Sequence, residues 1–142
     1  MYDRGPQHDD VVELALWLHN AIYDPQARDH EERSADGCTD LAKSAGVSTT
    51  ISAGAHACIL ATRHRHLPTN NAEQLMVSID LVILGEVPKR FRTNDRAIRK
   101  EYSWVPIATY RQERARVLRS FLTRPTVFRC LGLNRGSVVQ RD

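Results

Sequence analysis

The sequence predicts an all-α protein, a single bundle of about six helices, and three observations lead to this fold class. Apolar residues recur at steps of three and four along nearly the whole chain, which is the period of a helix buried on one side. Prolines and glycines fall between these segments, where helices start and stop. The 142 residues suffice for one domain, and we expect its core over about residues 9–124 and a tail over residues 125–142.

Capping residues and apolar spacing predict the first two helices. Asp9 or Asp10 can cap a helix that ends at Asp24, because a residue before proline is biased away from helix. A second helix starts near Asp29 and stops at Gly46. The inner faces of these two helices are predicted to hold Val11, Leu14, Ala15, Leu18, Ile22, Ala35, Cys38, Leu41, Ala42 and Ala45.

The next two helices follow by the same reasoning. Ser48 can cap the third, which Pro68 bounds, and the fourth runs from about Asn71 to Leu84 and stops at Gly85. The run "MVSIDLVIL" in the fourth has strand propensity, but the chain offers no second strand to pair with it, so we predict helix. The inner positions are Ile51, Ala55, Cys58, Ile59, Thr62, Leu75, Ile79, Val82 and Ile83.

Prolines delimit the last two helices. Pro88 opens the fifth, Pro106 lies in the first turn of the sixth, and Pro125 closes it. The shared apolar faces are predicted to hold Phe91, Ile98, Tyr102, Tyr110, Val117, Leu118, Phe121 and Leu122.

Composition excludes several classes of protein. Charged residues make up 26% and hydrophobic residues 42%, and no apolar run approaches the roughly 20 residues of a membrane span. The polar N-terminus does not resemble a signal peptide. Three scattered cysteines fit reduced thiols better than a disulfide framework. We therefore expect a cytoplasmic protein that does not enter a membrane.

The net charge of +3 is unevenly distributed. Residues 1–88 carry six Lys/Arg against 13 Asp/Glu, whereas residues 89–142 carry 14 against four. Such asymmetry can mark a nucleic-acid or anion partner. It is also expected of ordinary charged helix surfaces, or of two halves that dock on each other.

Asp80 is the most unusual residue on local physics, since it lies between Ile79 and Leu81. A buried carboxylate is costly unless a cation, a metal ion or several donors meet it. The alternative is that Asp80 faces water on a polar side of the helix, with Ser78 and Glu73 near it.

Histidines offer further candidates. His19 can be a metal ligand or a hydrogen-bonded core residue, and Asn20 beside it offers a metal one neutral oxygen. His64 and His66, near a helix end, can interact with the helix dipole or contact a phosphate. The chain contains no zinc-finger spacing, P-loop, dinucleotide fingerprint or nucleophile elbow.

Several segments together resemble a known family. "ALWLHNAIYDPQARDHEERSA", residues 15–35, resembles the "ALWFHDAVYDP…NEERSA" pattern of a bacterial branch of the HD-domain superfamily, the predicted metal-dependent phosphohydrolases. "CILATRH", residues 58–64, and "SIDLVILGEVPKRF", residues 78–91, follow in the family's order, as do the helices over residues 97–128. The similarity covers roughly residues 11–128.

The resemblance implies an all-helical HD-like domain and a metal site made of a histidine, a His-Asp doublet and a later aspartate. It places His19 and Asn20 at the doublet and Asp80 at the last ligand. The implied metal is Mg, Mn, Fe, Co or Ni, which would activate water against a phosphomonoester or nucleotide. Arg33, with the two acids before it, and His64 would lie in the same pocket, so the candidate catalytic residues are Asn20, Arg33 and His64.

The sequence departs from the family pattern in two ways. Asn20 removes one negative charge from the doublet, which lowers affinity for a hard cation. The family's first histidine lies well upstream, and His8 is too close to His19 to take its place. His19 and Asp80 are thus two of four usual ligands, so the site is expected to be weakened or to hold no metal. Loss of the family's first helix would expose an apolar patch and favour a homo-oligomer.

Three functions stay open at this point. The first is a phosphohydrolase with a weakened metal site. The second is a non-catalytic or regulatory module that binds a phosphate-bearing small molecule through Arg33, Arg63 and His64. The third is non-specific nucleic-acid binding through the basic half, which ranks last because no recognition motif or stacking aromatic stripe accompanies the charge.

Overall fold

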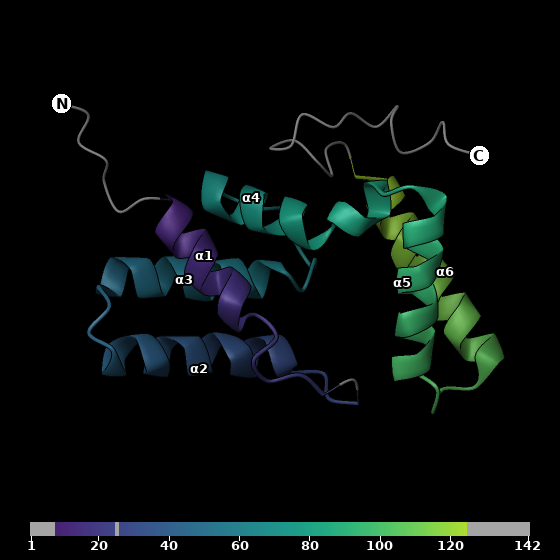
Figure 1. Ribbon diagram of the computed structural model, residues 1–142, viewed down its shortest axis with the longest axis horizontal. Coiled ribbons are helices and arrows are strands. Elements are labelled where there is room, and N and C mark those ends of the chain that lie inside the picture. The colour runs from purple at the N-terminus through teal and green to yellow at the C-terminus, as the bar shows by residue number, and fades with distance from the viewer. Residues whose placement is uncertain (1–7, 25, 125–142) are drawn as a thin grey trace. The chain divides into compact units, whose positions relative to one another are not determined.

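The computed structural model describes residues 8–24 and 26–124, and within these ranges every regular element is a helix (Figure 1). This confirms the predicted all-α class. The elements are α1 (His8–Leu18), α2 (His30–Ser44), α3 (Thr49–Ala61), α4 (Asn71–Asp80), the 3-10 turn η1 (Val82–Gly85), α5 (Pro88–Glu101) and α6 (Ile107–Leu122). No helix in the described ranges is both long and apolar enough to cross a membrane. The predicted tail and Pro125 lie outside the described residues.

The chain divides into two compact units, residues 1–80 and 81–142, where the sequence analysis expects one domain. Each unit is described by itself. The first contains α1 to α4, and the second contains η1, α5 and α6.

The first unit is built around α3, which contacts α1, α2 and α4. Helices α2 and α3 run side by side in opposite directions, and α1 crosses α3 (Figure 1). Small side chains dominate the core, so the helix axes can approach closely. The core residues are Val11, Val12, Ala15, Ala35, Cys38, Ala55, Cys58, Ile59, Ala72 and Met76.

Gly54 marks the closest approach of α1 to α3. A Cβ atom added there would lie 2.9 Å from Cγ1 and 3.1 Å from Cγ2 of Val11. Only a glycine leaves room for this β-branched side chain, so the position of α1 on α3 depends on the absence of a side chain at residue 54.

Local capping fixes two helix starts and one stop. The Ser48 hydroxyl accepts a hydrogen bond from the Ile51 amide at 3.3 Å, as predicted. Gly46 has φ +73°, the left-handed conformation of a helix stop. At the start of α4, the buried Glu73 carboxylate accepts hydrogen bonds from the amide and the hydroxyl of Thr69. Burial, together with this carboxylate, raises the pKa of the nearby Cys58 thiol to about 12.

Two predicted helix ends are wrong. α1 ends at Leu18 and not at Asp24, so Ile22 lies in the following turn. α4 ends at Asp80 and not at Leu84, because the chain tightens into the 3-10 turn η1. Four residues predicted to face inward are exposed: Leu41, Ala45, Val82 and Leu122.

Side-chain contacts join α5 to α6 in the second unit. Pro88 is the first residue of α5, as predicted. Arg114 donates to the Asp95 carboxylate at 2.8 Å. Arg99 donates to the backbone oxygens of Tyr102 and Val105 in the turn between the helices. Phe121 is the one buried hydrophobic side chain described within α5 and α6, so polar contacts are a visible part of what joins these two helices.

Two glycine substitutions test the packing of α1 on α3. We expect Gly54→Ala to lower the free energy of unfolding by about 1–3 kcal/mol, because the new methyl group overlaps Val11. Gly37→Ala is the matched control within α2, since the nearest atom to its Cβ is 3.8 Å away at the flexible end of Ile22. Better helix propensity should make this control more stable by about 0.5–1 kcal/mol.

Urea denaturation of both variants measures the two effects. Equal stability of the two variants would contradict the close approach of α1 to α3.

Candidate functional site

Three helix C-termini of the first unit converge on the carboxylate of Asp80. His19 follows the last residue of α1, His64 follows the end of α3, and Asp80 is the last residue of α4. His64 Nε2 lies 2.8 Å from Asp80 Oδ2, within hydrogen-bond distance. His19 Nε2 lies 3.9 Å from Asp80 Oδ1. The carboxylate is thus placed between two imidazole rings.

The helical period of α4 directs Asp80 inward. The buried residues of this helix include Ala72, Glu73, Met76 and Val77, and position 80 continues that face by helical spacing. The Asp80 side chain retains 26% of its exposure. Glu73 and Ser78 are themselves buried, so they do not form a water-facing polar side together with Asp80.

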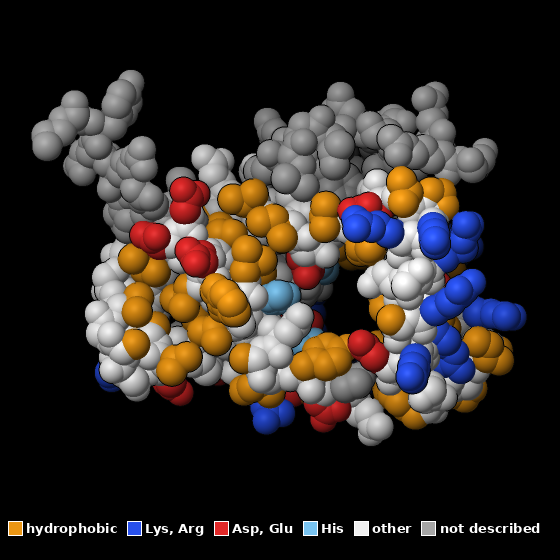
Figure 2. All heavy atoms as spheres, viewed as in Figure 1, with side chains coloured by type: hydrophobic (Ala, Val, Ile, Leu, Met, Phe, Trp, Pro, Cys, Tyr) orange, Lys and Arg blue, Asp and Glu red, His pale blue; other side chains and the backbone are white. Residues whose placement is uncertain are grey.

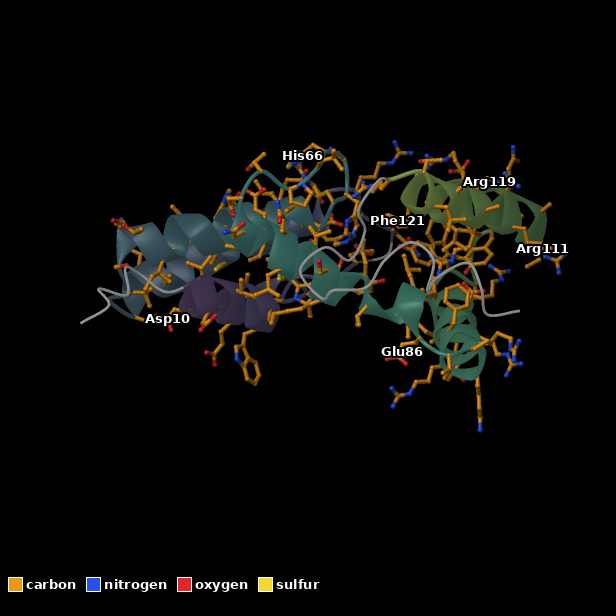
Figure 3. All side chains as sticks on the ribbon, turned by 90° about the horizontal axis from the view of Figure 1, so that it is seen from above. Asp10, His66, Glu86, Arg111, Arg119 and Phe121 are labelled. Carbon is orange, nitrogen blue, oxygen red and sulfur yellow. The ribbon has the colours of Figure 1, made fainter. Side chains whose placement is uncertain are left out.

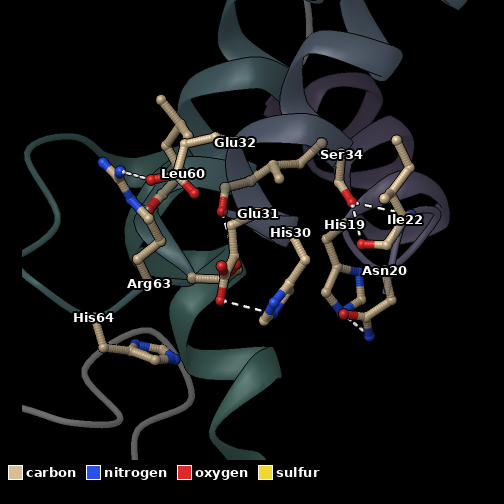
Figure 4. Close-up of polar contacts among 12 residues, drawn as sticks. His19, Asn20, Ile22, His30, Glu31, Glu32, Ser34, Leu60, Arg63 and His64 are labelled. Atoms are coloured by element: carbon tan, nitrogen blue, oxygen red, sulfur yellow. Dashed lines mark hydrogen bonds and ion pairs between the residues drawn. The ribbon is translucent and has the colours of Figure 1, made fainter. Parts of the chain in front are cut away.

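The hydrogen bonds of His19 define its tautomer. Nδ1 lies 2.9 Å from the backbone oxygen of Leu16, which can only accept, so Nδ1 carries the proton. The Asn20 amide nitrogen lies 3.0 Å from Nε2, which therefore accepts (Figure 4). The Nε2 lone pair is the one that a metal ion would use, and the Asn20 amide donates to it.

Ser34 holds the turn that follows the His19–Asn20 pair. Its buried hydroxyl accepts from the Ile22 amide at 3.1 Å and donates to the Ile22 backbone oxygen at 3.0 Å (Figure 4). These two bonds satisfy backbone groups that the early end of α1 leaves without helical partners. They attach the turn to α2.

His64 reaches Asp80 from an uncommon backbone conformation. It has φ +57°, the only positive value among the described residues other than glycine. Its amide donates to the Ala61 backbone oxygen at 3.1 Å. A non-glycine residue is held there at a cost, and such residues cluster at functional sites.

The start of α2 lies next to the residues that follow α3. Arg63 donates to Glu32 Oε1 at 2.5 Å, and this hydrogen bond lowers the pKa of the Glu32 carboxyl. His30 Nε2 lies 3.0 Å from Glu31 Oε1 (Figure 4). His30 Nδ1 and Glu32 Oε2 are buried without a hydrogen-bond partner among the described residues.

Arg33 does not join this cluster. It is exposed, and no side-chain hydrogen bond or ion pair of Arg33 occurs within residues 8–24 and 26–124. Helical spacing places it opposite the buried Ala35 and Ala42. The basic side chain beside the acids of α2 is Arg63, which the sequence analysis named only for the binding-module alternative. The sequence feature that could have identified Arg63 is the segment "ATRHRH", which contains both Arg63 and His64.

The electrostatics of this site favour a cation. Each helix C-terminus carries roughly half a negative charge, and three of them meet at an ionisable carboxylate. The 3.9 Å between His19 Nε2 and Asp80 Oδ1 can be bridged by one ion with bonds of about 2.0–2.2 Å at a wide angle.

The set of ligands is nevertheless small. The described residues contain no group of three or more His, Cys, Asp or Glu side chains arranged to hold a metal ion. Catalytic sites for zinc use three protein ligands. His19 and Asp80 are thus two ligands where a catalytic site needs three, so they fit at most a weakly held ion.

Comparison of the chain with known protein families, with curated proteins and with solved structures finds no match to any of them.

The backbone of residue 64 can be tested by substitution. His64→Ala and His64→Gly both lose the contact to Asp80, but only glycine accepts φ +57° without strain. We expect the glycine variant to be more stable than the alanine variant by about 1 kcal/mol. The control is the exposed helical Ala53, where glycine should instead be less stable by about 1 kcal/mol. Thermal denaturation measures all the variants, and the same order at both positions would contradict the assigned backbone conformation.

The Glu32–Arg63 pair predicts a pH dependence. Because the folded-state pKa of Glu32 is lowered, the pair stabilises the protein above the ordinary carboxyl pKa of 4.5 and loses this effect as the pH falls further. Glu32→Gln should therefore reduce the free energy of unfolding at pH 6–7 more than at about pH 3. Urea denaturation of the two proteins at both pH values measures the difference, and a difference independent of pH would contradict the pairing.

Proposed function

We propose that this chain is an HD-domain-like protein related to the metal-dependent phosphohydrolases, with a metal site weakened by Asn20. The observation that supports this most is the meeting of His19 Nε2, His64 Nε2 and the Asp80 carboxylate at three helix C-termini. The sequence resemblance contributes the reaction class, hydrolysis of phosphomonoesters or nucleotides.

Each residue has a separate role in this proposal. His19 and Asp80 are the ligands of a divalent cation, which when bound would polarise water and neutralise phosphate oxygens. His64 is a positioning residue, because its hydrogen bond fixes one oxygen of Asp80 and leaves the other directed toward His19. Asn20 can turn its amide oxygen to a cation but contributes no charge. Arg63, fixed by Glu32, supplies positive charge beside the site.

The donor set also favours a second candidate, a module that binds a phosphate-bearing molecule without hydrolysing it. The Asn20 amide donates to His19 Nε2, the nitrogen that would bind a metal ion. This nitrogen therefore has a hydrogen-bond partner in the absence of a cation. The residues that would meet a phosphate in this case are Arg63 and the exposed Arg65. Calorimetry with a panel of nucleotides, in the presence and absence of metal, separates the two candidates.

A homo-oligomer belongs to the same proposal. Trp17 of α1 is 79% exposed, and Leu41 and Leu67 are each 55% exposed. Large exposed apolar side chains of this kind favour association with another protein surface.

Restoring the carboxylate tests the proposed function. In Asn20→Asp, an anionic oxygen would replace the amide 3.0 Å from the His19 Nε2 lone pair, and two acceptors at that distance require a metal ion or a proton between them. We expect Mn²⁺ to bind at least about tenfold more tightly, which corresponds to about 1.4 kcal/mol. Turnover of p-nitrophenyl phosphate should rise with metal occupancy. Calorimetry and a colorimetric assay measure the two effects.

Asn94→Asp is the matched control, because it adds the same charge on α5, in the other unit. It should leave Mn²⁺ affinity and turnover unchanged. If Asn20→Asp also changed neither quantity, the metal-site proposal would be refuted.

A further inference from the structure

The second unit carries more positive charge than its acids can neutralise. Between residues 89 and 124 the chain has 11 Lys/Arg and three Asp/Glu. Several of the arginines have partners: Arg90 pairs with Glu86, Arg114 with Asp95, and Arg116 with Glu113. Arg99 donates to two backbone oxygens and lies over the Tyr110 ring. Figure 2 shows the basic side chains gathered over α5 and α6.

Four of the remaining cations form a row on α5, which we call the α5 stripe: Lys89, Arg92, Arg96 and Lys100. Their steps of three, four and four residues place them on one side of the helix over roughly 16 Å. All four are exposed, and none forms an ion pair with an acidic side chain in the described part of the chain.

This arrangement is unfavourable for the isolated helix. Like charges at spacings of three and four residues each cost an isolated helix about 0.2–0.5 kcal/mol. Other arginines of the same unit, such as Arg114, form ion pairs with acidic side chains and so contribute to the fold. The α5 stripe has no such partners, so its charge is available to an external anion.

We propose that the α5 stripe binds the phosphate backbone of double-stranded nucleic acid without sequence preference. A small anion would occupy one or two of the cations, whereas a duplex presents one negative charge per about 1.7 Å along its axis and can meet the whole row. Arg92 and Arg96, in the middle of the α5 stripe, can each bind a phosphate through two parallel hydrogen bonds. The exposed Arg111 and Arg119 of α6 point outward in Figure 3 and add to the positive field of the unit.

An anionic membrane fits the stripe less well. A helix that lies in a membrane interface inserts an apolar face beside its basic residues. No large hydrophobic side chain of α5 is exposed. The exposed large hydrophobic residues described in this unit all lie outside α5: Val82, Val87, Trp104, Ile107 and Leu122. We therefore commit to the duplex and treat membrane binding as an outcome of the test.

The inference is tested by fluorescence anisotropy. The full chain is titrated, in the presence of EDTA, into a labelled duplex of about 20 base pairs at several salt concentrations between about 50 and 200 mM. The affinity should fall steeply with added salt. Neutralising the stripe (Lys89→Gln, Arg92→Gln, Arg96→Gln and Lys100→Gln together) should weaken binding at least about tenfold and reduce the slope of log K against log salt by about three to four. Each single substitution should reduce the slope by about 0.9. The single variants keep the inference testable if the quadruple variant unfolds.

The matched control removes the same four charges elsewhere in the unit, by Arg90→Gln, Arg111→Gln, Arg116→Gln and Arg119→Gln together. This control should lower the slope of log K against log salt by less than half the decrease caused by neutralising the α5 stripe. Equal losses in the two quadruple variants, or no binding by the unmodified chain at low salt, would overturn the inference. Stripe-dependent binding to vesicles that contain phosphatidylserine, without binding to the duplex, would overturn it in favour of a membrane. The EDTA makes the result independent of the proposed metal site.

Discussion

The close packing of α1 on α3 is the constraint on which the candidate site depends. Gly54 leaves room for Val11, and alanines at positions 15 and 55 let the two helices approach. Each helix carries a site histidine just beyond its C-terminus, so the axial position of one helix on the other sets the distance between the rings. A shift of one helical turn, about 5.4 Å, would separate His19 from Asp80. Ser34 then fixes the turn after His19, and the unusual backbone of His64 completes the approach to the carboxylate.

The sequence predicted the features that depend on neighbouring residues. Ser48 as a cap, Gly46 as a stop and Pro88 as a first residue are all decided within one turn of helix, and all three are confirmed. The end of α1 was not predictable in this way, because the competing hydrogen bonds come from Ser34, 12 residues further along the chain. Periodicity cannot anticipate a side chain from another helix.

The position of Asp80 on α4 shows a second limit. The predicted inner stripe of a helix extended to Leu84 is only partly correct. Leu75 and Ile79 pack partly buried against the core, whereas Val82 and Ile83 lie in η1, beyond the end of α4. The buried residues of α4 are Ala72, Glu73, Met76, Val77 and Ser78, so the apolar run identified only part of the inner face. Only the order of segments that resembles the HD superfamily placed Asp80 and His19 at one site, and the 3.9 Å between them agrees with that placement. The same resemblance also placed Arg33 in the pocket, where the described structure does not bring it.

Asn20 determines how the proposed metal site differs from one with an aspartate at the same position. An aspartate at this position would bring a second carboxylate to the His19 Nε2 lone pair, and the pair would require a cation or a proton between them. Asparagine removes that requirement because its amide donates directly to Nε2 at 3.0 Å. The remaining negative charge, Asp80, is met by the His64 ring at 2.8 Å. A dication bound at His19 Nε2 in the proposed site would first have to displace the Asn20 amide. In the proposed metal site, an amide in place of the carboxylate would therefore lower the demand for a cation at His19.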